Sequence, residues 1–337
     1  MRKQRSALFL ALALILAACG GTSAETTVET TVASVAATTT TTEQASTTTS
    51  TAAVAEPEAV TFVGADGVES TIEDTSRIVS LGGDLTEIIF ELGLGDNVVG
   101  IDVTTTYPAE ATDIAVVGFG QQISPEPILA LEPTLVLADT QAGPPEVLQQ
   151  IRDAGVPVVV LEYQSTLDGV GTKIGQVAEI LGVPEAGQAL ADRVNGEITE
   201  AQTLAAQADT QPNVAFIYVR GPELVLLFGA GMPTSAMIEG ANAIDVAAAS
   251  GVFGAAPVTP EALVAAAPDV IVVPESGFAA LGGADAFVAI PGIAETPAGQ
   301  TGALLVYDEA YFFNFGPRVG QALLQFVKDL HPELAGG

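Results

Sequence analysis

The chain has almost none of the residues that usually build disulfides, thiolate clusters or histidine-based metal sites. Its 337 residues include one cysteine, one histidine and no tryptophan, and only 10 lysines and arginines stand against 41 acidic residues. A single cysteine, Cys19, allows neither an intrachain disulfide nor a thiolate cluster. The formal charge of -31 argues against nucleic acid and anionic lipid as partners, because both are themselves negative.

The motifs that mark common enzyme classes are missing as well. The sequence has no nucleophile elbow, no Gly-x-Gly-x-x-Gly turn after a predicted strand, no phosphate-binding loop and no histidine-centred metal set. Because catalysis lacks its usual parts, we expect a binding protein rather than an enzyme.

The N-terminus has the layout of an export signal. Basic residues cluster within 2–5 and precede an apolar run at 7–18, which is too short to span a bilayer comfortably. The run ends in small residues before Cys19, and this junction resembles the lipobox of bacterial lipoproteins, whose cysteine becomes acylated. We therefore expect a signal peptide at 1–18 and a protein anchored by lipid to the extracytoplasmic side of the cell membrane.

Residues 19–58 comprise the lipidated cysteine and a predicted tether. From 20 to 57 the chain is mostly Thr, Ser, Ala and Glu, with an unbroken threonine run at 38–42. Such a composition cannot bury enough apolar surface to fold. We expect a disordered segment that holds the folded part away from the membrane, and the sequence leaves open whether it carries sugar.

The remaining chain, about 280 residues, is long enough for two lobes. Short β-rich runs alternate with helical stretches in both halves, which favours an α/β fold with mostly parallel sheets and crossover helices. The expected parts are an N-terminal lobe at 59–166, connecting helices at 167–208 and a C-terminal lobe at 209–334. The expected strands lie at 77–81, 134–138, 156–161, 213–219, 269–273 and 303–307.

The connecting segment predicts two helices, at 167–181 and 185–206, separated by Gly182-Val183-Pro184. Apolar residues keep helical spacing through the second helix over roughly five turns. One long helix between two α/β lobes is a stiff connection, so we expect limited hinge closure.

A segment at 124–137 is repeated at 259–272. Each copy begins with a capping Ser or Thr, continues with proline and a glutamate in the first helical turn, and passes through another proline into a strand. Glu126 and Glu261 therefore hold equivalent places, one per lobe. From the residues alone each is either a favourable helix-start residue or a functional acid. A surface adhesion or scaffold protein would fit the lipobox and the tether, but would leave this pairing unexplained.

Several segments together resemble one family. They are 77–88, Leu92-Gly93, 98–102 and 106–108. These are similar to the helical-backbone (class III) binding proteins of ABC importers, which carry siderophores, haem and cobalamin, and the resemblance extends from about 77 to 328. The segments most similar to the haem-binding branch are Gly143-Pro144-Pro145, the Tyr107-Pro108 loop and 314–318.

The resemblance implies two Rossmann-like α/β lobes joined by a long rigid helix, with the ligand in a cleft between them. It also implies that Glu126 and Glu261 dock on arginines of the permease. The expected function is capture of haem and its delivery to an ABC importer for iron acquisition; a ferric-siderophore or cobalamin receptor is the alternative. We expect a monomer that contacts the membrane only through its lipid anchor.

Ferric haem outside cells suits a hard anionic oxygen ligand, and tyrosinate is a natural choice. The only histidine, His331, follows the last predicted helix, and we expect it at the surface. Among the five tyrosines, three are weaker candidates because each follows or ends a strand or precedes an aromatic pair. These three are Tyr163, Tyr307 and Tyr311.

Tyr107 and Tyr218 are the better candidates, as either or both ligands of the iron. Tyr107 lies in a Thr-rich loop and matches the tyrosine that ligates haem in several relatives; simple packing against the lobe is its alternative role. Tyr218 and Arg220 share a strand face, where the guanidinium would favour the phenolate and could meet a haem propionate. The other expected cleft residues are Phe119, Gln121 and Gln122 on one wall and Met232 on the opposite wall.

Overall fold

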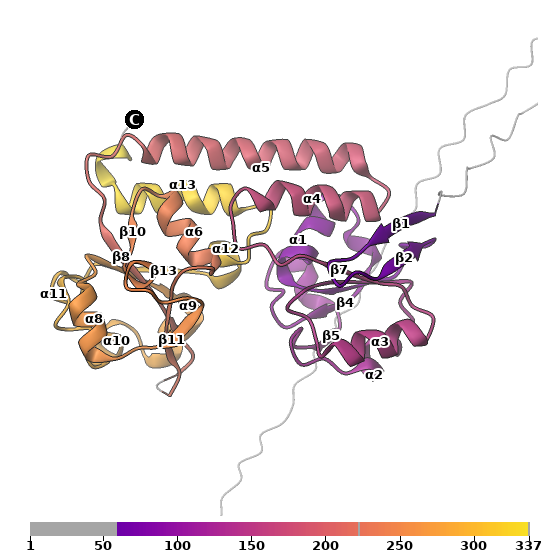
Figure 1. Cartoon of the computed structure of the whole chain (residues 1–337), viewed down its shortest axis with the longest axis horizontal. Coiled ribbons are helices and arrows are strands. Elements are labelled where there is room, and N and C mark those ends of the chain that lie inside the picture. Colours follow the sequence, from indigo (N-terminus) through magenta and orange to yellow (C-terminus); the bar gives the residue numbers. More distant parts are fainter. Residues whose placement is uncertain (1–58, 222, 336–337) are drawn as a thin grey trace, which may run out of the picture. The chain divides into compact units, whose positions relative to one another are not determined.

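The structure is a computed structural model, and it describes residues 59–335 except position 222. The expected signal peptide, Cys19 and the tether lie outside the described residues. The folded part forms one compact unit. Within it, two sheets are linked by a layer of helices (Figure 1).

The N-terminal lobe is built on a five-stranded, all-parallel sheet with strand order β5-β4-β3-β6-β7. Four of its strands are almost wholly buried, as expected for a sheet covered on both faces. An antiparallel hairpin, β1 (Val60–Val63) and β2 (Glu69–Ile72), precedes the sheet. The sheet strands are β3 (Ile78–Leu81), β4 (Val98–Asp102), β5 (Val116–Gly118), β6 (Leu135–Asp139) and β7 (Val158–Leu161). The helices are α1 (Gly83–Glu91), α2 (Pro125–Leu129) and α3 (Pro145–Asp153), with short 3-10 turns at Gly95–Asn97 and Ala109–Asp113.

The connection consists of two helices, as predicted. They are α4 (Gly169–Ile180) and the 22-residue α5 (Pro184–Ala205), and the break between them falls where Gly182 takes a positive φ and Pro184 begins the next helix. In Figure 1, α5 runs alongside α4 at one end and α13 (Val319–Leu330) at the other.

The C-terminal lobe has a mixed sheet with strand order β11-β9-β8-β12-β13, to which β10 adds beside β8. β8, β12 and β13 are parallel, as the alternating pattern predicted, but β9 is reversed and pairs antiparallel with both β8 and β11. The turn after β8 is only a few residues long, and such a short turn returns the chain antiparallel to the strand it leaves. The strands are β8 (Asn213–Val219), β9 (Val225–Phe228), β10 (Ile244–Asp245), β11 (Ala255–Pro257), β12 (Val270–Pro274) and β13 (Leu304–Tyr307). The helices are α6 (Pro233–Gly240), α7 (Val246–Ala249), α8 (Pro260–Ala266), α9 (Glu275–Leu281), α10 (Ala284–Val288), α11 (Pro297–Thr301) and α12 (Glu309–Phe313), and a 3-10 turn follows α13 at Pro332–Leu334.

One hydrophobic cluster runs through both lobes and the connecting helices. It includes Ile78 from β3, Val194 from α5, Phe216 from β8 and Phe326 from α13, all buried. Because the connecting helices share this core with both sheets, the lobes are linked by packing as well as by the chain. This continuous core supports the predicted stiff connection.

His331 corrects one expectation. Instead of lying at the surface it is fully buried at the C-terminal end of α13, and its Nε2 lies 2.9 Å from the carbonyl oxygen of Ala241, which follows α6. The imidazole ties the end of one helix to the end of another, which sequence position near the terminus could not indicate. In the part of the chain that the structure describes, no helix is both long enough and apolar enough to cross a membrane.

Candidate functional site

Tyr107 lies in the loop that follows β4, on the edge of the sheet where the parallel strands end. Its side chain is 38% exposed. The guanidinium carbon of Arg318 lies 3.5 Å from the centre of the Tyr107 ring and 5.4 Å from the centre of the Tyr311 ring. The arginine comes from the start of α13, in the other half of the chain, so the two lobes meet at this cation–π contact.

Glu87 of α1 holds Arg318 in place. The guanidinium donates Nε to Oε1 at 3.0 Å and Nη2 to Oε2 at 2.9 Å, and the Arg318 backbone N–H donates to Oε1 at 3.1 Å. Such a two-pronged arginine–carboxylate pair fixes geometry as well as charge. Burial raises the pKa of Glu87, and the contacts with Arg318 oppose that rise.

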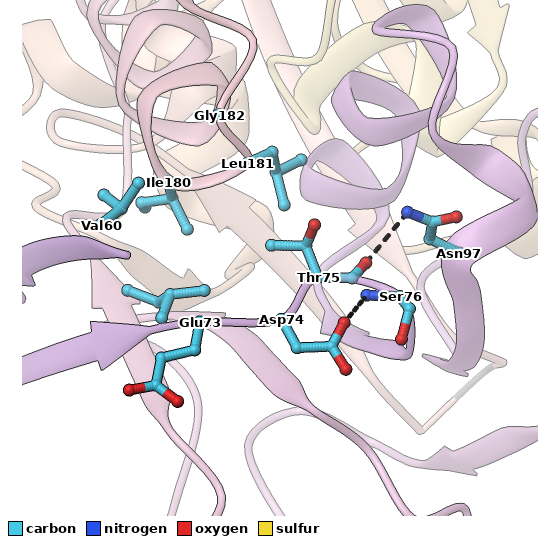
Figure 2. A pocket seen from close by; sticks show the side chains of 10 residues that line it. Val60, Glu73, Asp74, Thr75, Ser76, Asn97, Ile180, Leu181 and Gly182 are labelled. Carbon is cyan, nitrogen blue, oxygen red and sulfur yellow. Dashed lines mark hydrogen bonds between the residues drawn. The ribbon is translucent and has the colours of Figure 1, made fainter. Parts of the chain in front are cut away.

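A hollow of about 350 Å³ opens beside Tyr107. It is lined by Glu87, Phe90, Glu91, Tyr107, Pro108 and Glu110. A second hollow, of about 200 Å³, lies between the β1–β2 hairpin and the end of α4 (Figure 2). There the polar groups bond to one another: Asn97 donates to the Thr75 carbonyl at 3.0 Å and the Ser76 N–H donates to Asp74 at 2.7 Å. The second hollow contains none of the predicted ligand-binding residues.

Tyr218 occupies the end of β8 in the C-terminal lobe. It is half-buried and stacks on Phe228 with ring centres 5.3 Å apart. Its neighbour Val219 faces a different core cluster, as strand alternation requires. Arg220 is exposed just beyond the strand, and its backbone N–H closes the following turn on the Leu224 carbonyl.

The other three tyrosines are poor sources of a phenolate. Burial and the negative charges of nearby aspartates raise the pKa of Tyr163. Tyr307 donates its hydroxyl to Asp329 at 2.5 Å, and burial together with that carboxylate raises its pKa. Burial raises the pKa of Tyr311 despite the nearby arginine. A raised pKa disfavours the deprotonated form that ferric iron binds.

The remaining predicted residues have clear positions. Phe119 is 36% exposed, and Gln121 and Gln122 are exposed beside it in the loop after β5. Met232 is half-buried, precedes α6 and packs against the shared core. Its place in the wall of the ligand site remains a prediction.

Glu126 and Glu261 lie exposed in the first turns of α2 and α8. Thr259 caps α8 by accepting from the Ala262 N–H.

The structure adds Glu87 and Arg318 to the site and places Tyr311, a weaker candidate from the sequence, near Arg318. Glu87 and Arg318 are 231 positions apart, and no local pattern predicts such a pair. The one available signal was the segment 314–318, which resembles the haem-binding branch. Among residues 59–335 without 222, no group of three or more His, Cys, Asp or Glu side chains is placed to hold a metal ion.

Residues 78–311 match the periplasmic binding protein family. The chain belongs to this family. Curated relatives of this periplasmic binding protein include the vitamin B12-binding protein of Vibrio campbellii (strain ATCC BAA-1116), which is 32% identical over 142 residues, 42% of this chain and 50% of that protein. The chain thus spans about half the length of the curated relatives it matches.

Two solved structures are similar to this chain over more of its length. The apo form of the periplasmic heme-binding protein RhuT from Roseiflexus sp. RS-1 is 42% identical, with a TM-score of 0.75 over 77% of this chain and 100% of that one. The heme-binding protein HmuT is 36% identical, with a TM-score of 0.77 over 81% of this chain and 90% of that one. The two-lobed class III fold predicted for this periplasmic binding protein is confirmed.

Proposed function

We propose that this protein captures ferric haem outside the cytoplasm and delivers it to an ABC importer. The observation that carries the proposal is Tyr107, an exposed loop tyrosine held under the Arg318 guanidinium where the two lobes meet. The similarity to RhuT and HmuT, both named as haem-binding proteins, favours haem over the other ligands of the class.

The chemistry of the two tyrosines suits ferric iron. A tyrosinate is a hard anionic ligand of the kind that ferric haem iron accepts. Arg318 lies over the Tyr107 ring, and Arg220 lies two positions from Tyr218. In a protein of net charge -31, these arginines are also the natural partners for the two haem propionates.

Solved variants of HmuT favour Tyr218 and Arg220 as the ligand-binding pair of the second lobe. They replace a tyrosine, and an arginine two positions after it, with alanine. Tyr218 and Arg220 have the same spacing. Another HmuT variant replaces a histidine. The single histidine of this chain, His331, is fully buried against Ala241, so it is not available to bind iron. Tyr107 would therefore be the second protein ligand of the haem iron, in addition to Tyr218.

The transport role extends the proposal to partners and location. Glu126 and Glu261 would dock on the transmembrane subunits of the permease, and acylation of Cys19 would anchor a monomer at the membrane. Cobalamin or a ferric siderophore is the alternative ligand, because vitamin B12-binding proteins are among the curated relatives. That likeness covers less than half of this chain, whereas the likeness to RhuT covers 77%.

An absorption titration with ferric haem tests the proposal. The full chain should give a saturable Soret shift with tyrosinate charge-transfer bands. Tyr107→Phe or Tyr218→Phe should each weaken those bands and weaken binding about tenfold or more, and the double variant should lose the bands. Tyr163→Phe is the matched control: that tyrosine is half-buried and its raised pKa disfavours the phenolate, so the spectrum should not change. Saturable binding of cobalamin or a ferric siderophore, together with no specific haem shift, would show that the protein binds that ligand and not haem.

A further inference from the structure

Asp102, the last residue of β4, binds two loops of the candidate site at once. Its side chain is buried, with 2% of the residue exposed. Oδ1 accepts the backbone N–H of Thr104 at 3.1 Å and the hydroxyl of the same residue at 2.6 Å. Oδ2 accepts the backbone N–H of Gly120 at 3.2 Å. Thr104 belongs to the loop that carries Tyr107, and Gly120 to the loop that carries Phe119.

The hydrogen bonds continue from these loops to their neighbours. The Thr104 hydroxyl oxygen also accepts the Gly83 N–H at 3.0 Å, which fixes the loop to the start of α1. The Gly120 carbonyl accepts the Gly143 N–H at 2.9 Å, which adds the loop after β6. Asp102 therefore lies at the centre of a connected set of loops on the ligand-facing edge of the sheet.

Only a carboxylate fits this position. Both of its oxygens receive N–H or O–H donors, and hydrogen bonds to a charged acceptor are the stronger kind. An asparagine would keep one acceptor but would point an NH₂ donor at a second donor. A glycine at 120 also favours this close approach, since a Cβ there would lie 3.1 Å from Oδ2 and the carboxylate would have to shift slightly. Burial raises the pKa of Asp102, and the hydrogen bonds from Thr104 and Gly120 oppose that rise by favouring the charged form.

We infer that Asp102 is a positioning residue of the haem site: its carboxylate locks the Tyr107 loop to the Phe119 loop so that the phenol is held where the iron arrives. This inference rests on the proposed function for its ligand, but the loop lock itself exists without one. Preorganised loops bind more tightly because less ordering is left to be done when the ligand enters.

Hydrogen exchange on the ligand-free full chain tests the lock separately from haem. Asp102→Asn should speed amide exchange about tenfold at 103–107 and 119–122, while the β1–β2 hairpin and the C-terminal lobe keep their rates. Thr104→Val, which removes the bridging hydroxyl but no charge, should speed exchange at 103–107 and leave 119–122 unchanged, because Gly120 still donates to Oδ2. It covers the case in which Asp102→Asn folds poorly. Unchanged exchange in both variants would overturn the inference whatever the protein binds.

A double-mutant cycle with ferric haem tests the positioning of Tyr107. Asp102→Asn alone should weaken haem binding about tenfold and reduce the tyrosinate bands. In a Tyr107→Phe background the same substitution should have little further effect, because the group it positions is gone. An equal loss in both backgrounds would show a general structural effect and would overturn the positioning role. If the wild-type chain binds no haem, the proposed function fails and the exchange experiment alone decides the lock.

Discussion

At the scale of single residues, Asp139 offers a test of how the interior tolerates charge. Its carboxyl group ends β6, close to the charges of Asp84, Asp102 and Lys173. Burial first, and then the Asp84 charge, raise the pKa of Asp139 from 3.8 to about 7, although the Gln141 N–H and Lys173 oppose the rise. Lys173 is paired with Asp84 at 2.5 Å, so its charge is already largely neutralised by that partner.

The raised pKa predicts how stability depends on pH. The folded state binds this proton more tightly than the unfolded chain, so its stabilisation is complete below about pH 4 and is lost as the pH rises to about 7. Each tenfold difference in proton affinity between the folded and unfolded chain corresponds to about 1.4 kcal/mol. Asp139→Asn, which still accepts from Gln141, should therefore be more stable than the wild type by a few kcal/mol at pH 8, with the gap closing toward pH 4.

Urea unfolding at a series of pH values measures that gap, with Asp209→Asn, an exposed acid, as the control. The raised pKa of Glu87 is present in both proteins, so its effect cancels in the difference. Loss of the Asp139 charge also removes its repulsion with Asp102, which acts in the same direction as the predicted gap. A constant offset between wild type and Asp139→Asn at every pH would contradict the prediction.

At the scale of helices and strands, local chemistry predicted much of this fold. The break between α4 and α5 follows from Gly182 and Pro184, and the paired helix starts at Glu126 and Glu261 follow from their Pro-Glu sequences. The β1–β2 hairpin was missed, because its four-residue strands carry only a weak alternating pattern. Within the site, Tyr107 was predicted but Arg318 was not, since its position over that ring depends on packing between distant elements.

The contact between α4 and α5 depends on one such packing detail. A Cβ added at Gly187 of α5 would lie 2.1 Å from the Cβ of Ala178 on α4, a distance that forces the helices apart. Gly187→Ala should therefore lower stability by about 1–3 kcal/mol. Gly196→Ala is the matched control: it lies exposed on the same helix with nothing within 4 Å, and should raise stability by up to about 1 kcal/mol. Thermal unfolding decides, and equal shifts for both variants would refute the close contact.

At the scale of the whole molecule, the charge of -31 shapes how this protein meets its proposed permease. A protein so uniformly acidic is attracted to any basic surface, so attraction alone gives no orientation. Orientation requires particular carboxylates at fixed positions. In the proposed docking, Glu126 and Glu261 would meet that need, because each is exposed in the first turn of a helix and the two helices belong to different lobes. The shared core holds those lobes in register.

Charge reversal separates docking from ligand capture. Glu126→Lys with Glu261→Lys should abolish haem uptake by the reconstituted importer, since both lobes would lose their attraction to the permease, while haem affinity in solution stays within about twofold. The control is Glu200→Lys with Glu179→Lys, two exposed acids on the connecting helices, which changes net charge equally. If the control pair lowers uptake as much as the docking pair, net charge alone governs association. If only the docking pair does, the acidic residues act by position, and the repeated Pro-Glu helix starts are the geometric basis of transport.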